Sequence, residues 1–211
     1  MENHYFEMEE ETFNREGAHL VAKALLGTLC SADMPNRWDM YAIRNYFCRN
    51  AAWCFPTVEW ADSMAALCEG KKVLEIGAGN GLIAKLMRAR GVDWVATDAA
   101  PPERVLSEVE YLRAGHAVDK YVDECDLVFW SWWPHEGSAE DLYAAENFLK
   151  RGKRVIVVGE SGGGCTGSRD FWESDDIGIN YRVPEIREDL PSWDGIHDHT
   201  HEVVNSGEEV W

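Results

Sequence analysis

The stretch KKVLEIGAGNGLIAKLMRARGVDWVATD, residues 71–98, carries the strongest structural signal in the chain. Its first part, KKVLEIG, predicts a buried strand, LIAKLMRARG predicts a helix, and VDWVATD predicts a second strand. Between the first strand and the helix stand Gly77, Gly79 and Gly81, which allow the backbone to turn sharply. This order of strand, glycine turn, helix and strand predicts the start of a parallel α/β sheet.

The glycine turn is also the strongest candidate for a ligand site, because the helix that follows points free N–H groups into it. A dinucleotide turn reads G-x-G-x-x-G, but here Leu82 takes the last glycine position and Gly81 comes one residue early. Asp98 ends the second strand and is suited to accept both hydroxyls of a ribose. The candidate cofactor-binding residues of this region are Glu75, Gly77, Ala78, Gly79, Asn80, Gly81, Asp98 and Ala99.

The chain after residue 98 continues the alternation of strands and helices. We expect a helix that starts between residues 102 and 107, a third strand within 108–117, a fourth strand at 125–133 and a fifth at 153–160. A helix over 138–152, with Ser138 as its cap, separates the last two. After the loop 161–167, residues 168–175 predict a short helix, and residues 179–187 and 197–204 predict two more strands.

The chain before residue 71 has helical apolar spacing. Helices are expected at 17–30, 38–50 and 57–69, the last with Thr57 as its cap and Gly70 as its stop. The sequence therefore predicts an N-terminal helical extension, residues 1–70, and one compact Rossmann-like unit, residues 71–211, with helices on both faces of its sheet.

A G-x-G-x-G turn that follows an acidic residue resembles motif I of the class I S-adenosylmethionine-dependent methyltransferases. The resemblance covers about residues 71–205 and implies a seven-stranded sheet whose last strand is antiparallel, with S-adenosylmethionine bound above strands one and two. It also implies that Glu75 fixes the turn and the amino end of the ligand. The segments RNAAWCFP (49–56), DAAPP (98–102), GGCTG (163–167) and WDGIHD (193–198) are similar to one branch of these enzymes.

Two departures from the family pattern concern the adenine and acceptor sites. Many members place an acid after the third strand to bind adenine, where this chain has A-G-H-A with His116. Members that methylate amide or ring nitrogens carry a polar-Pro-Pro-aromatic turn after the fourth strand, where this chain has S-W-W-P-H, residues 131–135. Methylation of amide or base nitrogens is therefore not supported.

Methyl transfer from a sulfonium is a direct displacement, so the protein supplies alignment and, for some acceptors, a base. His135 lies just past the fourth strand and has a near-neutral pKa, and Glu160 ends the fifth strand on the same edge. These two are the candidate catalytic residues, and a solvated loop position is the alternative for each. His197 and Asp198 of the WDGIHD segment are expected on the substrate side.

Aromatic residues cluster near this edge. Alternate residues of a strand face opposite sides, so Trp130 and Trp132 are expected on one side, and Trp133 on the other or in the loop. Trp133 is either a core residue or a pocket wall that stacks on adenine or on a cationic or aromatic acceptor. Arg49 and Trp53 precede the first strand, where many family members cover the cofactor. Arg49 suits an ion pair with the methionine carboxylate, with a surface salt bridge as the alternative.

Cysteines and histidines give no clear metal signal. The six cysteines form no C-x-x-C pair and are expected to be reduced thiols. Cys165 is not needed as a nucleophile in this chemistry. His197, His199 and His201 alternate, which puts them on one face of a strand, but without a clear acidic or cysteine partner they are weak evidence for a metal site. No metal is expected.

The composition excludes several classes of partner. With 20 basic and 38 acidic residues the formal net charge is −18, which disfavours nucleic acid and anionic lipid as partners. No apolar run approaches the roughly 20 residues of a membrane helix, and the acidic start does not resemble a secretory signal. We therefore expect a cytoplasmic methyltransferase that uses S-adenosylmethionine on an oxygen or nitrogen of a small molecule or a protein side chain.

Two other functions compete with this interpretation. One is a methyltransferase-like binding or regulatory protein without turnover, which His116 and the altered turn at 131–135 suggest. The other is a nicotinamide-dependent oxidoreductase, which Leu82 in the glycine position disfavours.

Overall fold

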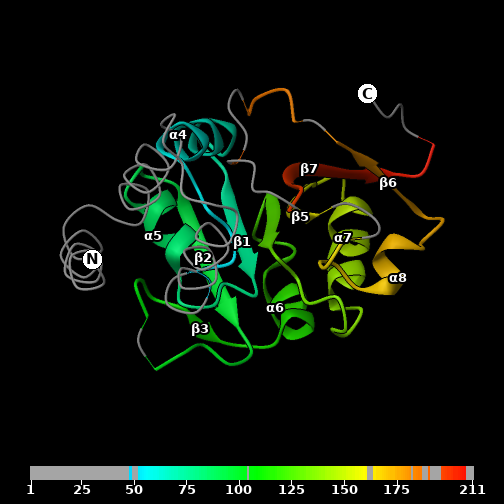
Figure 1. Ribbon diagram of the computed structural model, residues 1–211, viewed down its shortest axis with the longest axis horizontal. Coiled ribbons are helices and arrows are strands. Elements are labelled where there is room, and N and C mark those ends of the chain that lie inside the picture. The colour runs from blue at the N-terminus through cyan, green and yellow to red at the C-terminus, as the bar shows by residue number, and fades with distance from the viewer. Residues whose placement is uncertain are drawn as a thin grey trace, which may run out of the picture.

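The computed structural model describes residue 48 and the ranges 52–103, 105–160, 164–181, 183–186, 190 and 196–207. Seven strands form one sheet in the order β3-β2-β1-β4-β5-β7-β6 (Figure 1). The strands are β1 Lys72–Ile76, β2 Asp93–Asp98, β3 Glu110–Tyr111, β4 Leu127–Ser131, β5 Arg154–Glu160, β6 Ile177–Asn180 and β7 Asp198–Asn205. The helices are α4 Val58–Leu67, α5 Leu82–Arg88, α6 Ala114–Tyr121, α7 Glu140–Leu149 and α8 Arg169–Trp172.

The first five strands run parallel, and β7 joins β5 in the antiparallel direction, with β6 antiparallel to β7 at the edge. This is the sheet that the resemblance to class I methyltransferases implied. Because β1 to β5 are parallel, their carboxyl ends meet at one edge. The start of β7 reaches the same edge, since Asp198 pairs with Glu160 at the end of β5.

Helices cover both faces of the sheet, so each face has its own apolar core. Helices α4 and α5 lie on one side of the strands, and α7 and α8 on the other (Figure 1). Trp60 and Met87 belong to the first core with Phe129, and Val118 and Phe148 belong to the second with Trp130. Strands buried on both faces read as continuous apolar runs, which is why KVLEI and LVFWS could be recognised as strands.

Helix α4 begins where the sequence predicts. Thr57 caps it, because its hydroxyl oxygen accepts a hydrogen bond from the Trp60 N–H at 3.0 Å. The Trp60 indole N–H in turn donates to the Thr200 hydroxyl on β7, at 2.8 Å. This last part of the predicted helical extension therefore packs into the core of the sheet. The predicted helices at 17–30 and 38–50 lie outside the described residues, except for Cys48, which is helical.

Two predictions about helices are wrong. The described residues between 101 and 107 are not helical, because the Leu106 N–H donates to the Asn80 carbonyl of the glycine turn at 2.7 Å. Ser138 is not the cap of α7, which is Ala139. The Ser138 hydroxyl donates instead to the Glu140 carboxylate, at 2.8 Å.

Candidate active site

The glycine turn at the end of β1 has a left-handed backbone at alternate residues. Gly77, Gly79 and Gly81 have φ values of 65°, 55° and 79°, a region in which side chains are strained. The Ala78 N–H donates to the Thr97 carbonyl of β2 at 2.9 Å, which ties the turn to the neighbouring strand.

The three glycines meet different surroundings. A Cβ on Gly81 would lie 2.9 Å from Val109 Cγ2 and 3.2 Å from the Ser107 carbonyl oxygen, so Gly81 lets this segment pack on the turn. A Cβ on Gly77 would lie 3.4 Å from the ring of Trp133, whereas one on Gly79 would have no heavy atom of the described residues within 4 Å. Gly79 is therefore the glycine of the turn that no described residue covers, and the one over which a ligand has room to approach.

Asp98 lies at the end of β2, against this open part of the turn. One carboxylate oxygen accepts the Gly79 N–H at 2.8 Å, and the other accepts the Ala100 N–H at 2.7 Å. Each oxygen keeps a second lone pair, so the half-buried carboxylate can also accept hydroxyl donors. Ala99, which follows it, is exposed.

Glu75 is buried in β1, with 1% of its surface exposed. Its carboxylate accepts the Trp94 indole N–H at 2.6 Å, and the Ala84 N–H in the first turn of α5 is a further partner. Burial raises the pKa of the Glu75 carboxyl from 4.5 to about 8, a rise that the hydrogen bond from Trp94 opposes. Glu75 therefore links β1, β2 and α5 below the turn, and its contact with a ligand's amino end stays a prediction.

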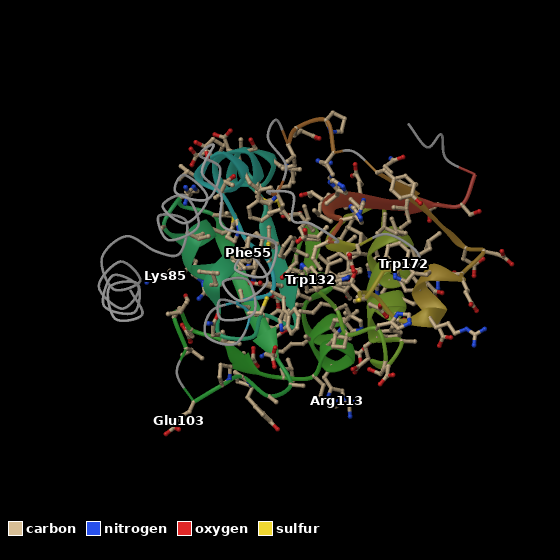
Figure 2. All side chains as sticks on the ribbon, in the orientation of Figure 1. Phe55, Lys85, Glu103, Arg113, Trp132 and Trp172 are labelled. Atoms are coloured by element: carbon tan, nitrogen blue, oxygen red, sulfur yellow. The ribbon has the colours of Figure 1, made fainter. Side chains whose placement is uncertain are left out.

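At the end of β4 the side chains no longer alternate regularly between the two faces of the sheet. Trp132 has a φ of 53° and is the one non-glycine residue with positive φ among those described. Because this left-handed residue breaks the strand alternation, Trp132 packs against the first core, whereas Trp130 and Trp133 belong to the second. The prediction that Trp130 and Trp132 share a side is wrong. Figure 2 places Trp132 near the middle of the molecule, between Phe55 and Trp172.

Trp133 is a core residue that also closes one side of the turn. It is 9% exposed, its ring is the neighbour of Gly77, and its indole N–H donates to the Ser138 carbonyl at 3.2 Å. A role in stacking on adenine stays a prediction.

Glu160 holds two loops at the end of β5. Its buried carboxylate accepts the Cys165 N–H at 2.8 Å and the His197 N–H at 3.1 Å. A Cβ on Gly164 would collide with Glu160 Cβ, so the loop can pass this close only with glycine there. The contacts that the structure gives Glu160 are thus those of an anchor for loops at the candidate site.

His135 is exposed on the loop after β4. Its Nδ1 lies 3.2 Å from the Gly167 carbonyl oxygen, and because a carbonyl only accepts, Nδ1 carries the proton in this contact. The neutral ring therefore has its lone pair on Nε2. An isolated bridge between Pro134 and Thr166 holds the two loops together beside it.

The remaining predicted residues are more scattered. His116 lies in the first turn of α6 and is exposed, Trp53 is 55% exposed, and Arg49 lies outside the described residues.

Sequence reasoning missed Tyr111, which pairs in register with Asp98 and is 74% exposed. A two-residue strand has no periodicity of its own, so only the pairing of β3 with β2 reveals this neighbour.

The histidines of the last segment do not share one environment. His197 and His199 are exposed, whereas His201 is 1% exposed and donates through Nε2 to the Gly159 carbonyl at 3.1 Å. Across the described ranges, no three histidine, cysteine or acidic side chains gather in a way that could hold a metal ion. Within the same part of the chain, every helix is too short or too polar to cross a bilayer.

Comparisons with known proteins point to methyltransferases. No protein-family model matches the chain. Ubiquinone biosynthesis O-methyltransferases from Pseudomonas aeruginosa strains are 37% identical to it over 62 residues, which is 29% of this chain and 26% of theirs. The match thus spans about a quarter of the length of these curated relatives.

Solved methyltransferases have a distant likeness to the structure. A methyltransferase from Archaeoglobus fulgidus is 11% identical with a TM-score of 0.42, over 79% of this chain and 93% of that chain. Mitomycin 7-O-methyltransferase is 11% identical with a TM-score of 0.41, over 96% and 67%.

The strand order and the antiparallel β7 give the chain the class I methyltransferase fold. The segment shared with the curated O-methyltransferases agrees with this assignment and bears out the resemblance that the sequence indicated.

Proposed function

We propose that the chain is an S-adenosylmethionine-dependent methyltransferase whose acceptor is an oxygen or nitrogen of a small molecule or a protein side chain. The observation that carries the proposal is that no described residue covers Gly79, whose N–H donates to the carboxylate of Asp98 at 2.8 Å. A turn of this kind suits a nucleoside, because it offers close backbone approach and a carboxylate for the ribose hydroxyls.

The residues of the turn fit the cofactor in a defined way. Asp98 would hold the ribose, Gly79 would let the ligand lie against the main chain, and Ala99 would border the adenine side. When bound, the sulfonium supplies an electrophilic methyl group, so the chain itself has to align the acceptor and keep water away.

His135 is the better candidate for a general base. Its neutral ring carries a lone pair on Nε2 when Nδ1–H donates to Gly167, and its side chain is exposed at the edge where an acceptor would bind. Glu160, by contrast, already accepts two backbone N–H groups. We infer that Glu160 positions the loops and that His135 removes a proton from acceptors that need it.

Binding of S-adenosylhomocysteine and of its 2′,3′-dideoxy analogue, measured by calorimetry, tests the ribose assignment. Asp98→Asn keeps the shape of the side chain but removes its charge, so we expect it to weaken S-adenosylhomocysteine by roughly 10- to 100-fold, as for hydrogen bonds to a charged group. The analogue should bind the wild-type chain weakly and lose little more in the variant. Asp176→Asn, at an exposed site just before β6, is the matched control.

The outcomes separate the competing functions. Equal affinities of wild type and Asp98→Asn for S-adenosylhomocysteine would overturn the ribose assignment. Binding of NAD in preference to S-adenosylhomocysteine would overturn the proposal in favour of an oxidoreductase. Tight binding of S-adenosylmethionine without methyl transfer to any compound of a broad acceptor panel would favour a binding or regulatory protein.

A further inference from the structure

We propose that Asp141 is a positioning residue for the candidate base His135 and acts on it through a single peptide group. The proposal rests on the methyltransferase function proposed above, because it concerns the same site. The peptide group joins Gly167 to Ser168, and its N–H donates to the Asp141 carboxylate at 2.7 Å. Its carbonyl oxygen lies 3.2 Å from His135 Nδ1. One planar group thus has a carboxylate at one end and the imidazole at the other.

The Asp141 carboxylate lies inside the protein, in the first turn of α7, with 0% of its surface exposed. Besides the Ser168 N–H it accepts the Ser168 hydroxyl at 2.7 Å and the Leu142 N–H at 2.9 Å. All three of these partners are donors, as an ionised carboxylate requires. Burial raises the pKa of the Asp141 carboxyl, and the bonds from Ser168 oppose this rise. Its charge therefore acts on the peptide group with little screening by water.

A peptide group carries polarisation from its N–H to its carbonyl oxygen. A charge-assisted bond at the N–H moves electron density towards the oxygen, so hydrogen bonds in a chain strengthen one another. The Gly167 carbonyl is therefore a better acceptor for the Nδ1–H of His135 than a carbonyl whose peptide N–H faces water. This favours the tautomer with the lone pair on Nε2. No proton passes through the peptide group; Asp141 influences which ring nitrogen holds the proton.

The preceding peptide group is also held at both ends, which fixes the direction of the Gly167 carbonyl. The Gly167 N–H donates to the Trp133 carbonyl at 2.8 Å, and the Thr166 carbonyl accepts the Trp172 indole N–H. Gly167 has a φ of 78°, and a Cβ there would collide with the Trp172 indole nitrogen. Only glycine suits this close, left-handed turn, which brings its carbonyl to His135.

Long-range proton–nitrogen NMR spectra of the histidine rings test the proposal, because they distinguish the two neutral tautomers. The sample is the full chain without ligand at about pH 8, where ordinary histidine rings are neutral. We expect wild-type His135 to be mainly Nδ1–H. Asp141→Asn should lower its ratio of Nδ1–H to Nε2–H by roughly three- to tenfold, because an amide has one acceptor oxygen for three donors. The exposed ring of His116, on α6, is the internal control.

Ser168→Ala is the matched control variant. It removes the hydroxyl bond to Asp141 and the cap of α8, but it keeps the backbone N–H that donates to Asp141. It should therefore leave the tautomer ratio of His135 within about twofold of wild type, although it loosens the same loop. Asp141→Ser is a second uncharged variant and should lower the ratio as Asp141→Asn does. A dispersed amide spectrum shows that each variant is folded.

The outcomes bear on the positioning role separately from the proposed function. A majority of Nε2–H in wild-type His135, or a fall in Asp141→Asn no larger than in Ser168→Ala, overturns the positioning role. If Asp141→Asn does not fold, Asp141→Ser decides by the same comparison. S-adenosylhomocysteine binding together with a tautomer that does not depend on Asp141 overturns this role alone. An Asp141-dependent tautomer in a chain that does not bind S-adenosylhomocysteine overturns the methyltransferase function, and with it the role of His135 as a base.

Discussion

At the scale of single residues, Glu75 is a carboxyl whose environment sets the protonation state in the folded chain. Burial raises its pKa to about 8, whereas in the unfolded chain it returns to its ordinary value near 4.5. Below pH 4.5 both states are protonated, and between pH 4.5 and 8 only the folded state holds the proton. The free energy of unfolding therefore falls as the pH rises through this window, by up to about 1.4 kcal/mol per pH unit.

Glu75→Gln should remove this contribution, because the amide does not titrate. We expect the variant to gain stability relative to wild type, by roughly 3–4 kcal/mol, as the pH rises from about 5 to about 8. Urea unfolding at several pH values measures the difference. In the control Glu110→Gln the difference should stay flat, because bonds from Lys120 and Tyr121 hold the pKa of Glu110 below its ordinary value. If the difference in free energy of unfolding between Glu75→Gln and wild type did not change with pH, this would contradict a protonated Glu75 in the folded chain.

Glycines of the turn should respond differently to alanine. Gly79→Ala meets no described neighbour, so its cost is the backbone strain of about 1–2 kcal/mol, and it places a methyl group where the ligand approaches. Gly81→Ala adds the collision with Val109 at 2.9 Å, so its loss of stability should be larger by roughly 1–3 kcal/mol.

Urea unfolding and S-adenosylhomocysteine calorimetry separate the two effects. Gly91→Ala is the matched control, since Gly91 has a φ of 82° and, like Gly79, no described heavy atom within 4 Å of its Cβ position, away from the turn. Gly79→Ala and Gly91→Ala should lose similar stability, and only the former should lose ligand affinity. Unchanged affinity in Gly79→Ala would show that the ligand does not approach this glycine.

Trp132 shows why the alternation of residues along a strand did not predict the positions of all the side chains near the candidate site. Period-two alternation predicts which side of the sheet each residue of β4 faces, but it holds only while the backbone stays extended. The sequence S-W-W-P-H contains no glycine to mark a left-handed residue. The bond from the Trp132 indole to Asp198, 66 residues away, stabilises this conformation, and no local pattern reports it.

At the scale of elements, a buried carboxylate joins α7 to α8. Asp141 in the first turn of α7 is 0% exposed and accepts both the Ser168 N–H and the Ser168 hydroxyl, each at 2.7 Å. Ser168 also caps α8, because its hydroxyl oxygen accepts the Phe171 N–H at 3.2 Å. The start of one helix thus fixes the start of the next.

Removing this link should loosen α8 together with the loop before it. We expect Asp141→Asn to lower the free energy of unfolding by roughly 2–3 kcal/mol and Ser168→Ala by roughly 1–2 kcal/mol. The double variant Asp141→Asn with Ser168→Ala should lose less than the sum, by at least about 1 kcal/mol, because both changes remove shared bonds. Strict additivity in urea unfolding would show that the two side chains act independently.

At the scale of the whole molecule, the excess of negative charge is the dominant feature. The formal net charge of −18 opposes the compact state through self-repulsion, and salt screens it over a Debye length of about 10 Å at 0.1 M. We therefore expect the melting temperature to rise when sodium chloride is increased from about 10 mM to about 0.2 M. A neutral osmolyte at equal osmolality is the control. A melting temperature that falls with salt would mean that favourable ion pairs outweigh the repulsion.

The sequence by itself determined where the main strands fall along the chain, the glycine turn and the acid at the end of β2, because these depend on local apolar runs, backbone freedom and chain order. It did not determine which glycine of the turn the described residues leave uncovered, that Trp132 turns to the first core, or that Trp53 stacks on it. Those features were decided by tertiary structure, since each depends on contacts between segments that lie far apart along the chain and meet only when the sheet is assembled.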